Sequence, residues 1–293
     1  MATFTSNTSG NWNVAATWGK EGLSGSGSPV AGTHYPQNSD EAHIDSGHTV
    51  TLVGSVSVGN VNIDGGTIAG GGHKITCVKT SGRLFDHSGT ITGDLDVELQ
   101  GTHTTTEDFV PSGSGNINNL ILNGSGLVVT INSDTTIDGV LTITQGTLTT
   151  DGTHSHDLTA TGGCEVGGSG VLTCNASTVV FGYLGFAGTV NAPTSAGSLT
   201  ITSEAGSGTY NTYAFKHAGT FNNNDGTVTI TTDTNTLLDF LGASGSLHSL
   251  TVDSSGSQRS YEWVGNMTLE GDLTVAKDSI LQGYNNTYDL TVT

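Results

Sequence analysis

Short stretches in which apolar and polar residues alternate recur along the whole chain, separated by turns that contain Gly, Asn, Asp or Ser. Typical stretches are residues 59–63 (Gly-Asn-Val-Asn-Ile), 139–143 (Gly-Val-Leu-Thr-Ile) and 226–230 (Gly-Thr-Val-Thr-Ile). Side chains two residues apart lie on the same side of a β-strand, so each stretch has an apolar face and a polar face. The pattern predicts many short strands, each with one face buried.

The stretches repeat at irregular intervals. The leading Leu or Val of successive units stands at positions 95, 120, 141, 158, 172, 199, 228, 250, 273 and 290. The steps therefore run from about 14 to 29 residues and centre near 22, which is about the length of one coil of a β-solenoid. The sequence predicts an all-β chain folded as a right-handed parallel β-solenoid (β-helix) with irregular coils and an N-terminal cap.

A β-sandwich or jelly roll is the alternative fold, since it also combines short strands with frequent turns. The similarity of the units along the whole chain and the lack of long polar linkers favour the solenoid. We expect three regions. Residues 1–46 form the cap and the loop that follows it, residues 47–180 form solenoid coils, and residues 181–293 form coils richer in aromatic residues, which we expect to make intermolecular contacts.

The first part of the chain, residues 10–68, contains Trp12 and Trp18, followed by prolines, an Asp-containing turn and a strand of sequence Gly-His-Thr-Val at 47–50. This order resembles the start of the eight-glycine extracellular domain and of related β-solenoids in bacterial adhesins and phage appendage proteins. Residues 221–230 and 250–252 resemble repeat coils of the same solenoids. The resemblance implies a protein that associates symmetrically, most often as a trimer.

Trp12 and Trp18 also have a role that follows from physical chemistry alone. The first coil of a solenoid leaves an apolar end and an unpaired strand edge open to water. Two indole rings are large enough to cover that end. We therefore expect Trp12 and Trp18 to form a structural cap rather than a ligand site.

The composition supports the β fold and restricts the partners. The 293 residues include 44 Gly, which suits turns that need a positive φ, and only 11% are charged. The net charge is −19, from 26 acidic and 7 basic residues, so nucleic acid and anionic membrane surfaces are repelled. Apolar runs of the roughly 18 residues that a membrane helix needs are absent from the sequence. We expect no nucleic-acid partner and no membrane insertion.

The three cysteines, Cys77, Cys164 and Cys174, are too few for a disulfide framework and lack the Cys-x-x-Cys spacing of zinc sites. Burial as small apolar residues inside the β core is the favoured interpretation, although Cys164 and Cys174 could meet across adjacent strands.

Three carboxylates, Asp94, Asp96 and Glu98, alternate along one predicted strand. Paired carboxylates can hydrolyse glycosides, but an outward row of charges on a half-buried strand is the favoured interpretation. No catalytic residue is assigned.

His154 and His156 stand two residues apart with Asp157 next to them, a spacing that can hold a metal ion if a neighbouring coil supplies a third ligand. Histidine is also common in exposed turns, and the turn is the favoured interpretation. We therefore expect no metal ion and no cofactor.

Aromatic residues gather late in the chain. One group, whose members can stack on sugars, pack inside the core or contact another subunit, consists of Tyr210, Tyr213, Phe215, Tyr261 and Trp263. Core or subunit contact is favoured over a glycan platform, because aromatic residues are common anchors of protein interfaces.

Together these features predict a non-enzymatic structural protein of a virion: a phage appendage, fibre or capsid-decorating protein, with host or glycan attachment as a role. The sequence starts at Met1 without an export signal, which fits assembly in the cytoplasm and a place on the virion surface. The expected partners are copies of the chain itself (a trimer is favoured), other virion proteins and a cell-surface glycan.

Two alternatives remain open. One is a bacterial surface adhesin or carbohydrate-binding module, located outside the cell or on its surface. The other is a polysaccharide hydrolase or lyase built on a β-helix.

Overall fold

The computed structural model describes residues 2–20, 34–78, 82–101, 106–203, 213–232, 234–241, 246–254, 258–284 and 288–293. These residues form strands and turns, and Ala15–Thr17 form a short 3₁₀ helix. Within these ranges, no helix has the length and apolar character needed to cross a membrane. The chain forms two compact units, Met1–Asp138 and Gly139–Thr293, so the division expected near residue 180 falls inside the second unit.

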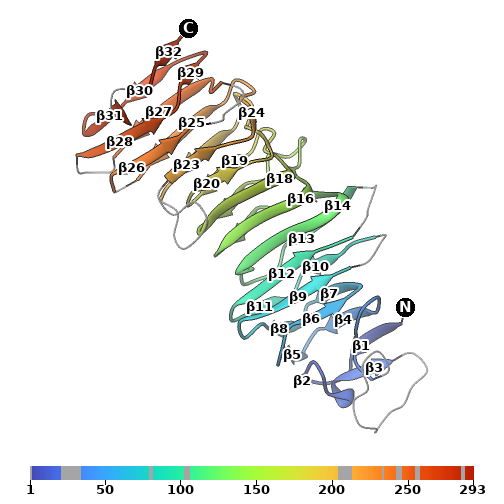
Figure 1. Ribbon diagram of the computed structural model, residues 1–293. Helices are drawn as coiled ribbons and strands as arrows, with labels where there is room; N and C mark the ends of the chain where they lie inside the picture. Colours follow the sequence, from blue (N-terminus) through green and yellow to red (C-terminus); the bar gives the residue numbers. More distant parts are fainter. Residues whose placement is uncertain are drawn as a thin grey trace. The chain divides into compact units, whose positions relative to one another are not determined.

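The first unit is built from short strands that stack in parallel (Figure 1). The strands are β1 (Thr3–Ser6), β2 (Gly10–Asn11), β3 (Trp18–Lys20), β4 (Glu41–Asp45), β5 (Thr49–Thr51), β6 (Val56–Val58), β7 (Asn60–Asp64), β8 (Thr67–Ala69), β9 (His73–Cys77), β10 (Phe85–His87), β11 (Thr90–Thr92), β12 (Leu95–Leu99), β13 (Thr106–Pro111), β14 (Asn119–Ile131) and β15 (Thr135–Ile137).

The described strands of the first unit form three ladders. One joins β1, β4, β7, β10, β13 and the second half of β14. The next joins β2, β5, β8 and β11, and the last joins β6, β9, β12 and the first half of β14. The chain visits each ladder in turn, which makes the unit a solenoid. At its N-terminal end, β3 pairs with β1 in antiparallel fashion.

The second unit repeats this arrangement. Its strands are β16 (Val140–Thr150), β17 (Leu158–Ala160), β18 (Gly163–Thr173), β19 (Thr178–Phe181), β20 (Leu184–Phe186), β21 (Thr189–Asn191), β22 (Ser198–Ile201), β23 (Tyr213–His217), β24 (Thr220–Asn222), β25 (Thr227–Thr231), β26 (Thr236–Asp239), β27 (Ser249–Asp253), β28 (Arg259–Val264), β29 (Met267–Leu269), β30 (Leu273–Val275), β31 (Ser279–Gly283) and β32 (Leu290–Val292).

The parallel ladders of the second unit run through several coils each. One joins β17, β19, β22, β25, β27 and β30. Another starts at β16 and β18, continues through β20, β23, β26, β28 and β31, and has a branch from β18 to β21 and β24. β29 pairs with β32.

The register of the ladders explains the irregular repeat. Glu41 lies opposite Asn60, 19 residues later, whereas Ser198 lies opposite Thr227, 29 residues later. The strands stay in register while the segments between them change length. This parallel stacking confirms the all-β solenoid and excludes the β-sandwich, whose sheets are antiparallel.

Inward-facing residues of successive coils lie in register and form columns in the core. In the first unit, Ile44, Ile63 and His87 occupy one column. In the second unit, Phe186 and His217 are register partners in the same way. Both histidines are 1% exposed, so each takes a position that aliphatic or aromatic residues fill in the neighbouring coil.

An aromatic cluster fills the core of the second unit. Each of its rings has neighbours with centroids 4.7 to 6.3 Å away, and its members are Phe186, Phe215, His217, Phe221 and Phe240. Aromatic pairs at such distances add stability beyond the area that they bury. These late aromatic residues therefore stabilise the interior instead of forming a surface.

Glycines stack at one corner of the first unit because successive coils approach closely there. A Cβ atom on Gly89 would lie 2.2 Å from the carbonyl oxygen of Gly66, and one on Gly113 would lie 2.2 Å from that of Gly89. Neither position has a positive φ. Glycine is therefore needed at this corner because a side chain would collide with the neighbouring coil. The sequence-based expectation that the corner glycines are needed for a positive φ is wrong here.

The three cysteines are free thiols inside the core, as the sequence predicts. Burial raises the pKa of Cys77 and of Cys174 to about 12. Burial also raises the pKa of Cys164 well above its ordinary value. A thiol that stays protonated at neutral pH is a poor nucleophile and a poor metal ligand, so we assign these residues no chemistry.

Candidate functional site

Trp12 and Trp18 lie near the N-terminus of the first unit and are buried, with 1% and 5% of their surface exposed. Their ring centroids are 4.9 Å apart with the planes 73° apart. Trp18 Nε1 donates a hydrogen bond of 2.6 Å to the carbonyl oxygen of Trp12, and Trp12 Nε1 donates one of 3.2 Å to that of Pro36. The pair has the burial and the contacts that a cap requires.

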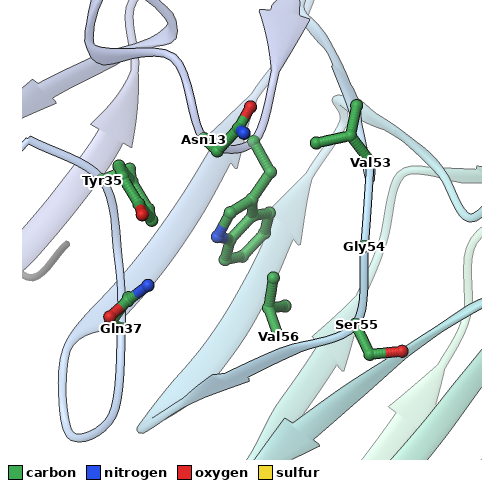
Figure 2. Close-up of a pocket in the computed structure, with 8 residues that line it drawn as sticks. Asn13, Tyr35, Gln37, Val53, Gly54, Ser55 and Val56 are labelled. Atoms are coloured by element: carbon green, nitrogen blue, oxygen red, sulfur yellow. The ribbon is translucent and has the colours of Figure 1, made fainter. Parts of the chain in front are cut away.

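A pocket of about 180 Å³ lies next to Trp12 in the first unit. Figure 2 shows Tyr35 and Gln37 on one side, and the segment from Val53 to Val56 on the other. The pocket is lined by Trp12, Asn13, Tyr35, Gln37, Val53, Gly54, Ser55 and Val56. Its volume corresponds to about six water molecules, which is below the range of about 300–1,000 Å³ typical of drug-sized ligands.

The lining of this pocket combines apolar and polar groups. Tyr35 is half-buried and Val53 is exposed, so both are accessible to a ligand. Asn13 and Gln37 offer amide donors and acceptors, and Ser55 offers a hydroxyl. Aromatic and aliphatic walls with a few polar groups are typical of sites for small molecules.

Sequence reasoning singled out Trp12 as a cap residue but missed the pocket beside it. Tyr35 and Gln37 flank Pro36, whose carbonyl oxygen accepts the Trp12 hydrogen bond. That contact joins residues 24 positions apart, and the strand pattern alone carries no signal for it.

The expected exposure of the carboxylate row Asp94, Asp96 and Glu98 is wrong for its last member. Asp94 lies exposed in the turn before β12. Asp96 is half-buried, and its Oδ1 accepts hydrogen bonds of 2.8 Å from the side-chain amides of Asn118 and Asn119. Glu98 is 6% exposed, since side chains from neighbouring coils cover it. The three carboxylates therefore do not form an exposed repulsive row.

Glu98 is the centre of a polar cluster that spans three coils. Its carboxylate accepts hydrogen bonds from Lys74 Nζ at 2.5 Å, from Gln100 at 2.6 Å and from Asn123 at 3.1 Å. Burial raises the pKa of the Glu98 carboxyl, but these hydrogen bonds outweigh burial and hold the pKa below its usual value. An ionised, fully engaged carboxylate suits a structural role better than that of a general acid.

The described members of the aromatic group considered as a contact or glycan platform do not gather on the surface. Tyr210 lies outside the described residues. Phe215 and Tyr261 are buried, and the hydroxyl of Tyr261 donates a hydrogen bond of 2.8 Å to the carbonyl oxygen of Asp253. Tyr213 and Trp263 are half-buried.

A β-bulge explains why the side chains of Tyr213 and Phe215 lie in different surroundings, although the two residues are two positions apart in one strand. The pairing of β23 with β26 shifts its register between these two residues, so the alternation of faces is interrupted. Phe215 enters the core, whereas the ring of Tyr213 lies 5.1 Å from Lys216 Nζ. Phe215 and Tyr261 are thus unable to contact a glycan or a second subunit directly.

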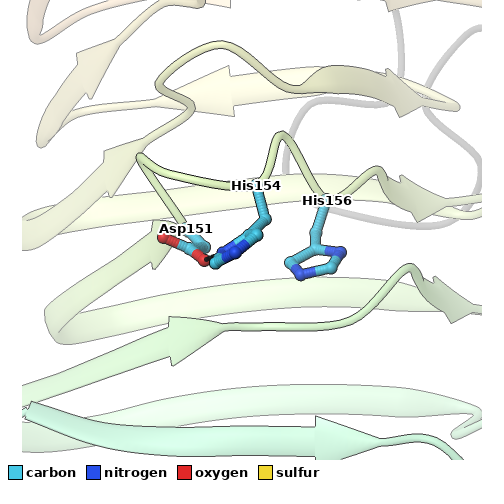
Figure 3. A group of neighbouring side chains, drawn as sticks. All are labelled: Asp151, His154 and His156. Carbon is cyan, nitrogen blue, oxygen red and sulfur yellow. Dashed lines mark hydrogen bonds and ion pairs between the residues drawn. The ribbon is translucent and has the colours of Figure 1, made fainter.

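A further cluster lies in the turn between β16 and β17 of the second unit, and consists of Asp151, His154 and His156 (Figure 3). One ligand atom from each residue lies within 4.8 Å of the others. His154 Nδ1 lies 2.5 Å from Asp151 Oδ2, and the two imidazole rings are 5.9 Å apart. The sequence analysis expected a third ligand from a neighbouring coil, whereas Asp151 lies in the same turn as the two histidines. Asp157 Oδ1 accepts a hydrogen bond from the amide of Thr178.

Comparison of the chain with known protein families, with curated proteins and with solved structures finds no match in any of the three. Inferences about function therefore depend on the geometry of the chain itself.

Proposed function

We propose that the protein is a non-enzymatic structural protein, a rigid β-solenoid that serves in a virion as an appendage, fibre or decorating component and supports attachment to a host. The observation that carries this proposal is that hydrogen bonds between outward-facing side chains join neighbouring coils, in addition to the packing of the core.

Outward-facing side chains form hydrogen bonds from coil to coil in both units. In the second unit, Asn222 donates to Asn191 at 2.7 Å, and Asn191 donates to Thr173 at 2.8 Å. In the first unit, Glu98 joins Lys74 of the preceding coil to Asn123 of the following coil. Such chains of polar contacts add to the backbone ladders and oppose the separation of neighbouring coils.

The charge of the chain supports the same role. A net charge of −19 keeps a protein soluble and discourages unspecific association with other acidic surfaces. Contacts of a structural protein with its own copies must then come from defined surfaces. We propose a homotrimer as the assembled form.

Particle association and oligomeric state test this proposal. Virus-like particles from cells that carry the gene are separated on a density gradient and labelled with an antibody against the protein. We expect the protein to migrate with the particles, with label on their surface, and the purified chain to sediment as a trimer. Label restricted to the cell envelope would instead favour a bacterial adhesin, and a sedimenting monomer would contradict the trimer.

We also propose a second role, glycan attachment through the pocket beside Trp12, because its lining suits one sugar ring. The apolar C–H face of a sugar can stack on the half-buried ring of Tyr35, while its hydroxyls bond to Asn13 and Gln37. The volume of about 180 Å³ suits a single terminal sugar better than a longer oligosaccharide.

A glycan array probed with the full chain tests this role. We expect Tyr35→Ala and Gln37→Ala to reduce the signal at least tenfold. Tyr284→Ala is the matched control, because Tyr284 is an exposed tyrosine of the second unit that does not line the pocket. Equal signals from all three variants would reject the pocket as the glycan site, and release of reducing ends from the array would favour the polysaccharide hydrolase or lyase.

A further inference from the structure

We propose that Asp151, His154 and His156 bind one divalent transition-metal ion of the Zn²⁺, Cu²⁺ or Ni²⁺ class on the surface of the second unit. This site differs from the one that the sequence considered and set aside, because its third ligand comes from Asp151 in the same turn and not from a neighbouring coil.

The geometry of the cluster fits a small cation. Bonds of about 2.1 Å to a tetrahedral ion place its ligand atoms roughly 3.4 Å apart. Here the three candidate atoms lie within 4.8 Å of one another. The hydrogen-bonded pair Asp151 Oδ2 and His154 Nδ1 is 2.5 Å apart and has to open by about 0.9 Å to take an ion between the two atoms. The side chain of His154 is 68% exposed, so small rotations that bring the three groups onto one ion meet little steric resistance.

The turn itself arranges the three side chains on one side. Asp151 Oδ1 accepts a hydrogen bond of 2.8 Å from the amide of Thr153, which fixes the carboxylate at the start of the turn. Ser155, between the two histidines, has a φ of 51°, in the left-handed region. The rings of His154 and His156 lie on the same side of the turn, with 27° between their planes (Figure 3).

The donor set selects the class of metal. Two imidazoles and one carboxylate suit Zn²⁺, Cu²⁺ and Ni²⁺, whereas Ca²⁺ and Mg²⁺ prefer sites made of oxygen atoms alone. Three protein ligands leave a coordination position for water or for a group from another molecule.

Calorimetric titration of the full chain with ZnCl₂ and electron paramagnetic resonance with Cu²⁺ test the site. We expect one equivalent of Zn²⁺ to bind, and the Cu²⁺ spectrum to show hyperfine coupling to two imidazole nitrogens. The variants His154→Ala and His156→Ala should each weaken Zn²⁺ binding at least tenfold, and Asp151→Asn should weaken it by a smaller factor.

Asp157→Asn is the matched control, since its side-chain oxygen can still accept the hydrogen bond from the amide of Thr178. We expect this variant to bind Zn²⁺ like the unchanged chain. Circular dichroism melting curves check that the alanine variants remain folded, which we expect for changes in a surface turn. Unchanged Zn²⁺ affinity in the double variant His154→Ala/His156→Ala would overturn the proposal, because other histidines would then bind the metal. A Cu²⁺ spectrum with oxygen ligands alone would overturn it as well.

Discussion

His87 lies in register with Ile63 in the core column of the first unit, so an imidazole occupies a position that an aliphatic side chain fills one coil earlier. Within the described part of the chain, neither ring nitrogen of His87 makes a hydrogen bond of good geometry, although the backbone groups of Gly89 and Ser114 interact with the ring, and the residue is 1% exposed. A buried polar group without a partner costs about 1–3 kcal/mol. His87 is therefore a weak point in an otherwise apolar column.

We predict that His87→Leu stabilises the protein by about 1 kcal/mol at pH 7, because it removes unpaired polar atoms and keeps most of the side-chain volume. Urea unfolding followed by circular dichroism measures the change. His87→Ala, which leaves a cavity, should instead destabilise the protein by about 2–4 kcal/mol. A loss of stability in His87→Leu would show that the imidazole makes a required polar contact.

The same residue should make stability depend on pH. Burial lowers the pKa of His87, so the unfolded chain takes up a proton near pH 6.5 while the folded chain does not. Stability is then retained above that pH and falls as the pH drops below it, by up to about 1.4 kcal/mol per pH unit. Urea unfolding at pH 7 and pH 5 should show a smaller loss in His87→Leu than in the unchanged chain.

His73→Gln serves as the control for this comparison, because His73 lies in β9 of the same unit with its side chain partly exposed. This variant should lose as much stability between pH 7 and pH 5 as the unchanged chain. If His87→Leu and the unchanged chain lost the same stability between pH 7 and pH 5, His87 would bind protons equally in the folded and unfolded states, and the prediction would be wrong.

The stacked glycines of the first unit lead to a prediction about packing between coils. Gly89→Ala places a methyl group 2.2 Å from the carbonyl oxygen of Gly66, so the coils must separate locally, at a cost of about 3 kcal/mol or more. Gly54→Ala is the matched control, because a Cβ at that position meets no atom within 4 Å. Thermal melting of both variants measures the difference, and equal melting temperatures would contradict the close approach.

The cap leads to a prediction about Trp18. Trp18→Ala removes a buried indole that packs edge-on against Trp12, so we expect a loss of about 3–5 kcal/mol. Trp18→Phe keeps an aromatic ring but loses the hydrogen bond to the carbonyl oxygen of Trp12, and should lose less. Chemical unfolding of both variants gives the order of stabilities. An unchanged free energy of unfolding in Trp18→Ala would show that the indole is not needed as a cap.

The alternation of apolar and polar residues is enough to predict the strands, because it depends only on local sequence, and the similarity of the units along the chain then favours the solenoid. The alternation also places Ile63, Leu95 and Cys77 in the core correctly. It fails where the backbone departs from regular alternation, as at the bulge between Tyr213 and Phe215. Glu98 shows a second limit, since its burial depends on side chains from the preceding and following coils.

The candidate sites were harder to predict than the fold. Tyr35 and Gln37 line the pocket together with Trp12, although they lie far from it in the sequence. A periodic pattern of apolar and polar residues does not predict such a contact. The turn that we propose as a metal site carries a clearer signal, because Asp151, His154 and His156 stand within six residues. The sequence analysis looked for the third ligand in a neighbouring coil, because strand alternation says nothing about side chains within a turn.

The buried thiols give the protein an internal reporter of its own opening. Cys77, Cys164 and Cys174 are inaccessible and protonated in the folded state, so an alkylating reagent such as iodoacetamide reaches them only when coils come apart. Cys77 belongs to the first unit, whereas Cys164 and Cys174 belong to the second. Mass spectrometry of the labelled peptides would therefore time the opening of each unit separately, in the natural sequence and without an added probe.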